Sequence, residues 1–559
     1  MGLKKYFNIS LLLILLLTLA FTGRAARLDG AYLHEVTTDL VTPHYSWGKP
    51  LAGGPIKALF ITPRNVAARE VVELAQRLSL DFEVVTTHSP VLFASSDKYS
   101  AEILGTSPKE KEAELLNKLR TRYDVIVFGN FTYDALPINI QYEVLRQVAN
   151  GSGLVFTYGS STDKRLFVNE YSQSLNNYVA NLPWRDMDYF MRKGSIGGYT
   201  LGEGKVVHID YGERATGATA PGLTPPIRNY SRSWEQTYNY YLGLIGKSLV
   251  WAANRESGFS LAMNRDGMVF SRDKLPGNIQ MEINAPQKET CDVVIRFLDE
   301  YGRIIKSYEK EVVTEKGRLQ TDIELPRLPV GSYFCEGVLK NKDGVLDWAT
   351  INFSVRDIVQ IDTLTFSDNK GQVKLTTPAA TELVLNISLL DYWGRLLSTK
   401  EYVVEKGDQT IYYSQSLEKC LTKFAIIRAE LIDNEEIVTR KEEEFYSGIQ
   451  TASQLFPSLI WGGFENYAVS IFHKRQLKAL GFDMYLEHPS SLTDEKFTSM
   501  SAATLAAANF DFIPYAYRIY AAVSPEGWTI DQWFTNQVKS NIEDRAFSNP
   551  EIKKAAVKV

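Results

Sequence analysis

Runs of apolar residues alternate with amphipathic stretches over the first half of the chain. Residues 56–62 and 123–128 are apolar runs of strand length, and apolar side chains at helical spacing follow the first of them. The alternation continues through a strand at 154–158 to a helix predicted over about 234–253, with Ser233 and Gln236 as its capping box. The apolar stripe of this helix is predicted at Trp234, Tyr238, Tyr241, Ile245 and Leu249. Strands that alternate with helices predict a parallel, doubly wound sheet, and we assign residues 56–257 to this α/β domain.

The second half of the chain changes to a period of two and repeats itself. The segment 298–305 recurs as 390–397, 92 residues later, and an alternating apolar strand leads into each copy. This pattern predicts two tandem immunoglobulin-like β-sandwiches, over residues 258–355 and 356–448. Each copy contains an Asp-x-aromatic-Gly-Arg element that predicts a hairpin turn. The turn explains Asp299 and Asp391, so neither is assigned a catalytic role.

Two cysteines of the first sandwich fit two interpretations. Cys335 lies two residues after Tyr333, the spacing of a tyrosine corner and the second disulfide cysteine in immunoglobulin-type sandwiches. The second repeat has Leu383 in place of Cys291 and Ile427 near the place of Cys335, so both cysteines are exchanged together. Either a Cys291–Cys335 disulfide or two small buried thiols satisfies this pattern.

From about residue 456 short apolar runs are again separated by helical stretches. Strands are predicted at 459–461, 483–487 and 510–515, as in the opening units of a (β/α) barrel, and residues 449–559 are assigned to a partial barrel. Side chains at the carboxyl ends of these strands are candidates for a sugar site: Trp461, Glu487, His488, Tyr515 and Arg518. In the alternative interpretation Trp461 and Tyr515 belong to the barrel core and Arg518 is an ion-pair partner. No residue is assigned as catalytic.

Composition describes an ordinary globular protein. The 559 residues are 45% hydrophobic and 23% charged, with a net charge of −5, which excludes a disordered chain and gives no electrostatic reason to expect nucleic acid. An apolar run over 11–21 follows two lysines and precedes Ala25 and Ala26, which predicts a signal peptide at 1–26 and an N-terminal extension at 27–55. We therefore expect an exported protein with no stable membrane span after cleavage.

Motifs for cofactor and metal chemistry are missing from the sequence. It contains no G-x-G-x-x-G after a strand, no P-loop, and no pair of histidines at metal-ligand spacing. No cofactor and no metal are predicted. His208, which alternates with apolar neighbours in a predicted strand, is interpreted as a structural residue.

The α/β region resembles the flavodoxin-like, class I glutamine-amidotransferase-like domains that are appended to some glycoside hydrolases. The matching segments are 42–50, 56–64 and 123–129. An active amidotransferase needs a cysteine on a tight strand-to-helix turn. The turn after 154–158 instead begins Gly159-Ser160, no cysteine precedes Cys291, and Ser160 lacks the G-x-S-x-G of an esterase. The domain is expected to lack a nucleophile.

The order of the predicted domains resembles large secreted bacterial proteins with a β-galactosidase-type barrel, as in glycoside hydrolase family 42 and its clan A relatives. That resemblance implies a carbohydrate substrate and two catalytic glutamates, after the fourth and seventh barrel strands. The sequence reaches about the third strand. It predicts the N-terminal portion of an exported glycoside hydrolase, inactive as given. The alternative is a non-catalytic secreted carbohydrate-binding or cell-surface protein.

Overall fold

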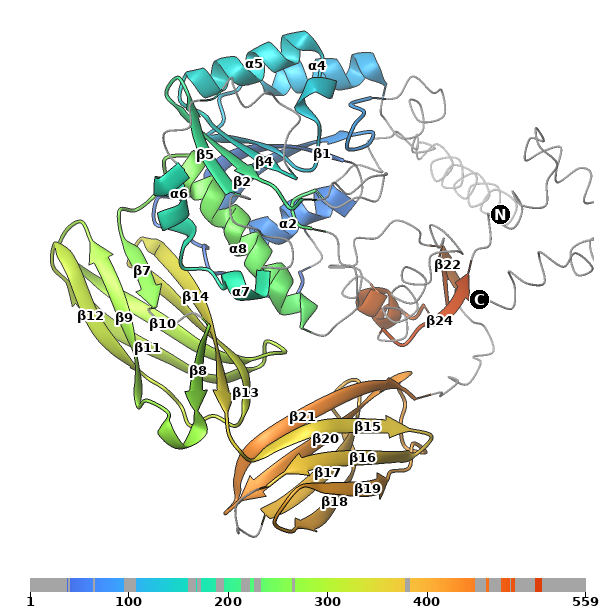
Figure 1. The fold of residues 1–559 in the computed structure, drawn as a ribbon. Helices are drawn as coiled ribbons and strands as arrows, with labels where there is room; N and C mark the ends of the chain where they lie inside the picture. The colour runs from blue at the N-terminus through green and yellow to red at the C-terminus, as the bar shows by residue number, and fades with distance from the viewer. Residues whose placement is uncertain are drawn as a thin grey trace, which may run out of the picture.

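The computed structural model describes an α/β domain, two β-sandwiches and a small third unit (Figure 1). The predicted signal peptide lies outside the described residues. These are 38, 41–63, 66–94, 107–158, 167, 172–187, 196–212, 222–225, 233–263, 267–377, 383–447, 459–461, 474–482, 484–487 and 508–514.

The α/β domain is built on one twisted sheet whose buried strands are almost wholly apolar. Its strands lie in the order β2-β1-β3-β4-β6-β5, and all neighbours are parallel except β5 and β6. The five parallel strands thus have the order 2-1-3-4-5 that is typical of flavodoxin-like sheets. The strands are β1 (Ile56–Pro63), β2 (Leu80–Thr87), β3 (Val125–Phe128), β4 (Gly153–Thr157), β5 (Ile196–Leu201) and β6 (Gly204–Ile209).

Helices cover both faces of this sheet, so each face has its own core (Figure 1). One face packs against α4 (Pro108–Lys118) and α5 (Ile138–Ala149), and the 3-10 helix η2 (Tyr133–Ala135) precedes α5. The other face packs against α2 (Val66–Arg77), α6 (Ser172–Val179), α7 (Trp184–Met187) and α8 (Trp234–Ala252).

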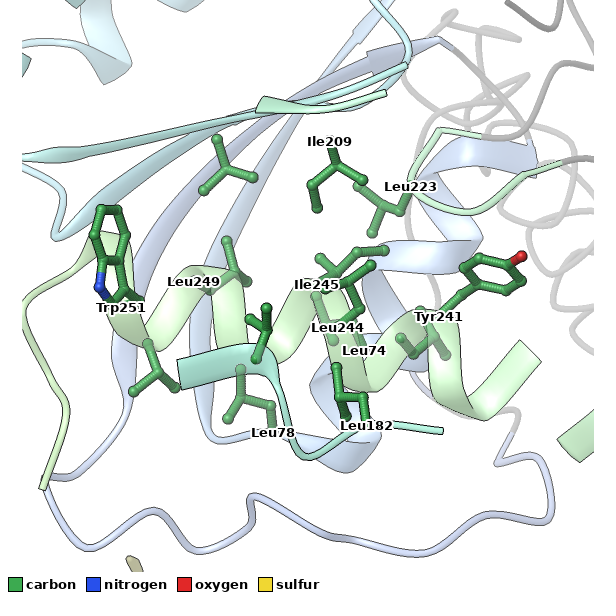
Figure 2. Packing of buried hydrophobic residues seen from close by; sticks show 14 of the residues in the cluster. Leu74, Leu78, Leu182, Ile209, Leu223, Tyr241, Leu244, Ile245, Leu249 and Trp251 are labelled. Atoms are coloured by element: carbon green, nitrogen blue, oxygen red, sulfur yellow. The ribbon is translucent and has the colours of Figure 1, made fainter. Parts of the chain in front are cut away.

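Helix α8 lies in the middle of the second core (Figure 2). Its predicted apolar stripe is confirmed, because Tyr241, Ile245 and Leu249 are fully buried against the sheet. The predicted capping box is wrong: Ser233 has helical dihedral angles and makes no side-chain cap bond. Gln236 is held instead by a hydrogen bond to Glu336 of the first sandwich, a partner 100 residues away.

Sandwich 1 follows α8 in the chain. Its two sheets face each other and enclose one apolar core. The sheets have the strand orders β11-β10-β13-β14-β8 and β12-β9-β7. The strands are β7 (Ser260–Met263), β8 (Met268–Ser271), β9 (Asn278–Ala285), β10 (Glu289–Asp299), β11 (Ile304–Thr314), β12 (Gly317–Glu324), β13 (Gly331–Asn341) and β14 (Gly344–Arg356), with the 3-10 helix η4 (Arg272–Lys274) after β8.

Sandwich 2 has the same plan with fewer strands. Its sheets have the orders β18-β17-β20-β21 and β15-β16-β19. The strands are β15 (Gln360–Ser367), β16 (Lys370–Thr376), β17 (Leu383–Asp391), β18 (Leu396–Val404), β19 (Gln409–Ser414), β20 (Phe424–Asp433) and β21 (Glu436–Tyr446).

The strand registers confirm the predicted repeat. Phe297 pairs with Cys335 in sandwich 1, and Leu389 pairs with Ile427 in sandwich 2, so both partners are shifted by the same 92 residues. The β10–β11 and β17–β18 ladders also share a register shift just before the hairpin, after Phe297 and after Leu389. The two sandwiches are therefore copies of one pairing scheme.

The structure contains no Cys291–Cys335 disulfide. Both thiols are free and buried, as is that of Cys420. Cys335 pairs with Phe297, six residues along β10 from Cys291, which at about 3.3 Å per residue places the two cysteines about 20 Å apart on one sheet. The tyrosine corner itself is present, because the Tyr333 hydroxyl donates to the carbonyl of Pro329 at 2.8 Å.

The third unit contains three short parallel strands in chain order. They are β22 (Leu459–Trp461), β23 (Met484–Glu487) and β24 (Asp511–Pro514), paired β22-β23-β24. Residues 474–479 are helical, and Leu477 packs with Tyr485, Ala508 and Phe510 in a small core. Among the residues that the structure describes, no helix has the length and apolarity needed to cross a membrane.

Candidate functional site

The predicted sugar-site residues fall partly within the described strands. Trp461 is the last residue of β22 and Glu487 the last of β23, and Trp461 pairs with Leu486 in parallel register. The backbones of Trp461 and Glu487 therefore reach the same end of this sheet. His488, Tyr515 and Arg518 lie outside the described residues.

In the α/β domain the chain itself fills the place where doubly wound sheets bind ligands. That place is the carboxyl edge beside β1 and β3, where the strand order reverses. Here the Thr157 hydroxyl donates to the Gly222 carbonyl at 2.6 Å. A Cβ atom added at Gly129 would lie 2.9 Å from that same carbonyl oxygen. Segment 222–225 thus packs directly on the edge of the sheet.

Glu70 of α2 anchors this segment from beneath. Its fully buried carboxylate accepts the backbone N–H groups of Gly222 and Leu223 at 2.8 and 2.6 Å, and the Thr224 hydroxyl also donates to it. Burial raises the pKa of Glu70 to about 7, although these hydrogen bonds favour the ionised form. The arrangement supplies hydrogen bonds to backbone rather than to a reacting group.

Tyr158 occupies the tight turn that follows β4. Its φ of +67° is unusual for a residue with a large side chain, and it lies at the strand end where the resemblance leads one to look for a nucleophile. The phenol is buried, donates to the Thr224 carbonyl and packs edge-on against Tyr211. The predicted turn residue Ser160 lies outside the described residues.

A polar seam joins α8 to sandwich 1. Residues three and four apart on the helix, among them Gln236, Tyr240, Gly243 and Lys247, face the β10-β13-β14 sheet. The Lys247 ammonium lies 2.6 Å from the Asp347 carboxylate, and both side chains are buried. A buried charge without its counter-charge is strongly destabilising, so this ion pair fixes the position of the helix on the sandwich.

Aromatic rings close the seam on one side. Trp47, from the segment before β1, stacks on Trp348 with ring centroids 4.7 Å apart. Trp47 also lies over Gly246 of α8, where an added Cβ atom would come within 2.5 Å of the indole ring. The Arg296 guanidinium lies 4.0 Å from the centre of the Tyr45 ring.

A narrow crevice remains between these groups. Its volume is about 20 Å³, which is room for one water-sized group and not for a sugar ring. Nε1 of the buried Trp348 has no hydrogen-bond acceptor among the described residues. Burial raises the pKa of Glu336. The positive charge of the Arg296 guanidinium, 3.3 Å away, offsets part of this rise. The crevice can hold a hydroxyl or a water between a donor and an acceptor.

Sequence reasoning missed the polar groups of the seam and of the α/β edge. Glu70 lies on a helix whose apolar spacing is clear, and Lys247 lies on the predicted helix 234–253, yet their partners are 154 and 100 residues away. The interpretation of His208 agrees with its burial among the rings of Phe156, Phe167 and Tyr199.

Comparison with known proteins gives low similarities. No family model and no curated protein sequence matches the chain. Solved structures that match in part include a putative β-galactosidase from Bacteroides fragilis (11% identity, TM-score 0.18, covering 44% of this chain and 44% of that one). Others are a glycosyl hydrolase family 2 member from Bacteroides cellulosilyticus (11%, 0.17, 52% and 40%) and red sea bream transglutaminase (10%, 0.17, 44% and 38%). The chain spans less than half the length of each of these three proteins.

The described residues thus define a multidomain, mostly β protein with one α/β domain. Its structural neighbours include β-galactosidase and family 2 glycosyl hydrolase proteins at low identity and TM-score.

Proposed function

We propose that this chain is the N-terminal portion of an exported glycoside hydrolase of β-galactosidase-like type. The observation that carries the proposal is the chain-ordered, parallel set β22-β23-β24, with a helix between its first two strands. A (β/α) barrel adds each parallel strand beside the previous one, and the order β22-β23-β24 agrees with that. In this proposal the β22–β24 unit is the opening of the catalytic barrel.

The sugar binds, in this proposal, at the carboxyl ends of these strands. Barrel enzymes carry their sites at that face, and Trp461 and Glu487 end β22 and β23 there. An indole ring stacks on the apolar face of a sugar, and a carboxylate accepts hydrogen bonds from its hydroxyls. His488, Tyr515 and Arg518 complete the site by stacking and hydrogen bonding. The two catalytic carboxylates, about 5 Å apart in a retaining enzyme, are not assigned to residues of this sequence.

Export is part of the proposal. A signal peptide cleaved near Ala25 or Ala26 directs the protein to the periplasm, the cell surface or the medium, where polysaccharide is found. Edman sequencing of the secreted protein tests this step. A mature N-terminus at Ala26 or Arg27 is expected, and a secreted chain that still starts at Met1 would contradict it.

Two measurements test the barrel site. Saturation-transfer NMR with methyl β-galactoside is expected to detect binding by the 559-residue chain, and Trp461→Ala and Glu487→Gln should weaken it at least tenfold. Tyr142→Ala, at an exposed aromatic of α5 in the α/β domain, is the matched control and should bind as the wild type does. The DNA after codon 559 should encode further βα units with a glutamate pair, and their product should hydrolyse aryl β-galactosides. A reading frame without them would leave the catalytic proposal without support.

A second candidate is a non-catalytic carbohydrate-binding protein. The observation that favours it is the exposure of aromatic side chains on sandwich 2, where Trp393 is 64% and Tyr412 is 75% exposed. Binding of a glycan by the full gene product without any turnover, lost on Trp393→Ala, would favour this candidate over the hydrolase.

A further inference from the structure

The two repeats contain hairpins with the same internal hydrogen bonds. In hairpin 1 (residues 299–303) Asp299 accepts the backbone N–H of Arg303 and pairs with the Arg303 guanidinium Nε at 2.6 Å. In hairpin 2 (residues 391–395) Asp391 accepts from Arg395 in the same two ways, with the Nε contact at 2.9 Å. A glycine with positive φ precedes each arginine, at +75° and +83°. Each arginine is therefore held rigidly in the same orientation relative to its own turn.

Hairpin 1 binds a carboxylate with this arginine. Nη1 of Arg303 donates to Oε1 of Glu442, on β21 of sandwich 2, at 3.0 Å. The Glu442 side chain is only 1% exposed, and Nε of Arg428 donates to the same oxygen at 2.7 Å. The Arg303 guanidinium also lies 5.0 Å from the Tyr301 ring centre, so the hairpin presents a cation beside an aromatic face. One copy of the hairpin thus shows which chemical group it recognises.

Hairpin 2 presents the same groups to solvent. Nη2 of Arg395 donates to the Lys419 carbonyl, and within the described residues Nη1 carries no hydrogen bond or carboxylate. The Arg395 side chain is 51% exposed, and Trp393 stands where hairpin 1 has Tyr301. A Cβ atom added at Gly394 would meet nothing within 4 Å, whereas one at Gly302 would meet Gln236 at 2.6 Å. Nothing among the described residues covers the hairpin 2 tip.

We propose that the tip of hairpin 2, formed by Trp393, Gly394 and Arg395, binds a glycan that carries carboxylates, such as a chain of uronic acid residues. Nη1 of Arg395 takes the sugar carboxylate as Nη1 of Arg303 takes that of Glu442. The exposed indole of Trp393 stacks on the sugar ring, and Lys419 in the neighbouring loop adds positive charge, partly balanced by the exposed Glu418. The choice of a sugar rather than an acidic peptide rests on the proposed glycan-processing function.

Affinity electrophoresis of the full chain in gels containing polygalacturonate tests this proposal. The wild type should be retarded by polygalacturonate, much less by neutral galactan, and the retardation should fall with added salt. Arg395→Gln should abolish the preference for the acidic polymer, and Trp393→Ala should raise the apparent Kd at least tenfold. Lys400→Gln, on β18 of the same sandwich, and Tyr142→Ala, at an exposed aromatic of α5, are the matched controls and should bind as the wild type does.

Three results would overturn the proposal. They are no retardation of the wild type, equal retardation of wild type and both tip variants, or stronger binding of poly-glutamate than of polygalacturonate, which would indicate an acidic peptide as partner. Melting curves of the variants separate lost binding from lost folding. Binding of methyl β-galactoside, measured with the same proteins, is expected to be independent of Trp393 and Arg395. Failure at the tip is therefore distinguishable from failure of the barrel site.

Discussion

Sandwich 1 and sandwich 2 share one strand-pairing scheme but have different surroundings. Sandwich 1 packs part of one sheet face against α8, through the buried Lys247–Asp347 pair and the Trp47–Trp348 stack. Sandwich 2 contacts sandwich 1 through the isolated bridge of Val330 with Thr439 and a few ion pairs, of which Arg303–Glu442 reaches a buried carboxylate.

Different residues build the sandwich and determine which other parts of the molecule it contacts. Alternating apolar residues and the Asp-x-aromatic-Gly-Arg turn recur in both copies and build the sandwich. Single polar residues, present in one copy only, determine what that sandwich touches. Asp347 and Glu336 anchor sandwich 1 to the helix, and Glu442 joins the two copies.

The largest expected effect comes from breaking the buried ion pair of sandwich 1. Lys247→Met leaves Asp347 buried without its counter-charge, which should lower the free energy of unfolding by about 3–5 kcal/mol. Urea denaturation followed by tryptophan fluorescence measures this loss. Lys310→Met, at an exposed lysine of β11, is the control and should change stability by less than about 0.5 kcal/mol. The double variant Lys247→Met/Asp347→Leu should recover part of the lost stability. Equal stability of the wild type and Lys247→Met would show that the seam does not anchor the sandwich.

The stability of the part of the molecule that contains the α/β domain and sandwich 1 should depend on pH in a way that the stability of sandwich 2 does not. Because the pKa of Glu70 is raised from 4.5 to about 7, the folded state keeps a proton between these pH values that the unfolded state loses. This contribution is fully present below pH 4.5 and disappears as the pH rises through 7, a change of up to about 3 kcal/mol. The unfolding temperature of the α/β transition should fall over this range, and calorimetry at several pH values measures it.

Glu70→Gln keeps the shape and an acceptor for the Gly222 and Leu223 N–H groups, so it should flatten that pH dependence. Glu110→Gln, at an exposed position of α4, is the control and should leave the pH profile as it is. A wild-type profile that is flat between pH 4.5 and 7 would contradict the assignment.

Two glycines on α8 should respond to the same substitution with opposite signs. At Gly246 a methyl group would lie 2.5 Å from the Trp47 ring, so Gly246→Ala should cost about 1–2 kcal/mol through overpacking of the seam. At Gly243 the nearest atom would be 3.9 Å away, so Gly243→Ala should stabilise the helix by about 0.5–1 kcal/mol. Thermal melting of both variants measures the pair, and a loss at Gly243 as large as that at Gly246 would mean that the seam is packed differently.

The smallest effect distinguishes the two hairpins. Arg303→Gln removes one of the two arginines from the buried Glu442 and should cost about 1–2 kcal/mol, whereas Arg395→Gln at the exposed tip should cost less than about 0.5 kcal/mol. A double-mutant cycle of Arg303→Gln with Glu442→Gln should give a coupling of at least about 0.5 kcal/mol. Equal costs at the two arginines would remove the contrast on which the tip site rests.

The elements that local pattern determines could be predicted from the sequence, and the contacts between distant residues could not. Apolar runs and turn residues specify β1, the apolar stripe of α8, and hairpins 1 and 2. Spacing within a few residues decides which face of each element is buried. Of the two alternatives for Cys291 and Cys335, the structure contains the two buried thiols; the sequence could not decide between them because a disulfide depends on the register between strands, which spacing to Tyr333 does not report.

The same reasoning explains what was missed at the sites. Gln236 has the right position for a capping box, but its amide donates instead to the buried carboxylate of Glu336 on another domain. Strand ends at Trp461 and Glu487 were predictable because parallel strands meet at one edge. The open tip at Trp393 and Arg395 was not, since the two hairpins have nearly the same sequence and differ in their surroundings.

The sharing of α8 between two modules bears on how such proteins can be recombined during evolution. A crossover between genes near codon 257, the apparent domain boundary, would bring in a foreign sandwich and leave Lys247 facing a surface without Asp347. A crossover near codon 357 would change only a few polar contacts, those of Val330 and of Arg272, Arg303 and Arg327. The α/β domain and sandwich 1 should therefore be inherited together, while sandwich 2 can be duplicated, lost or exchanged more freely.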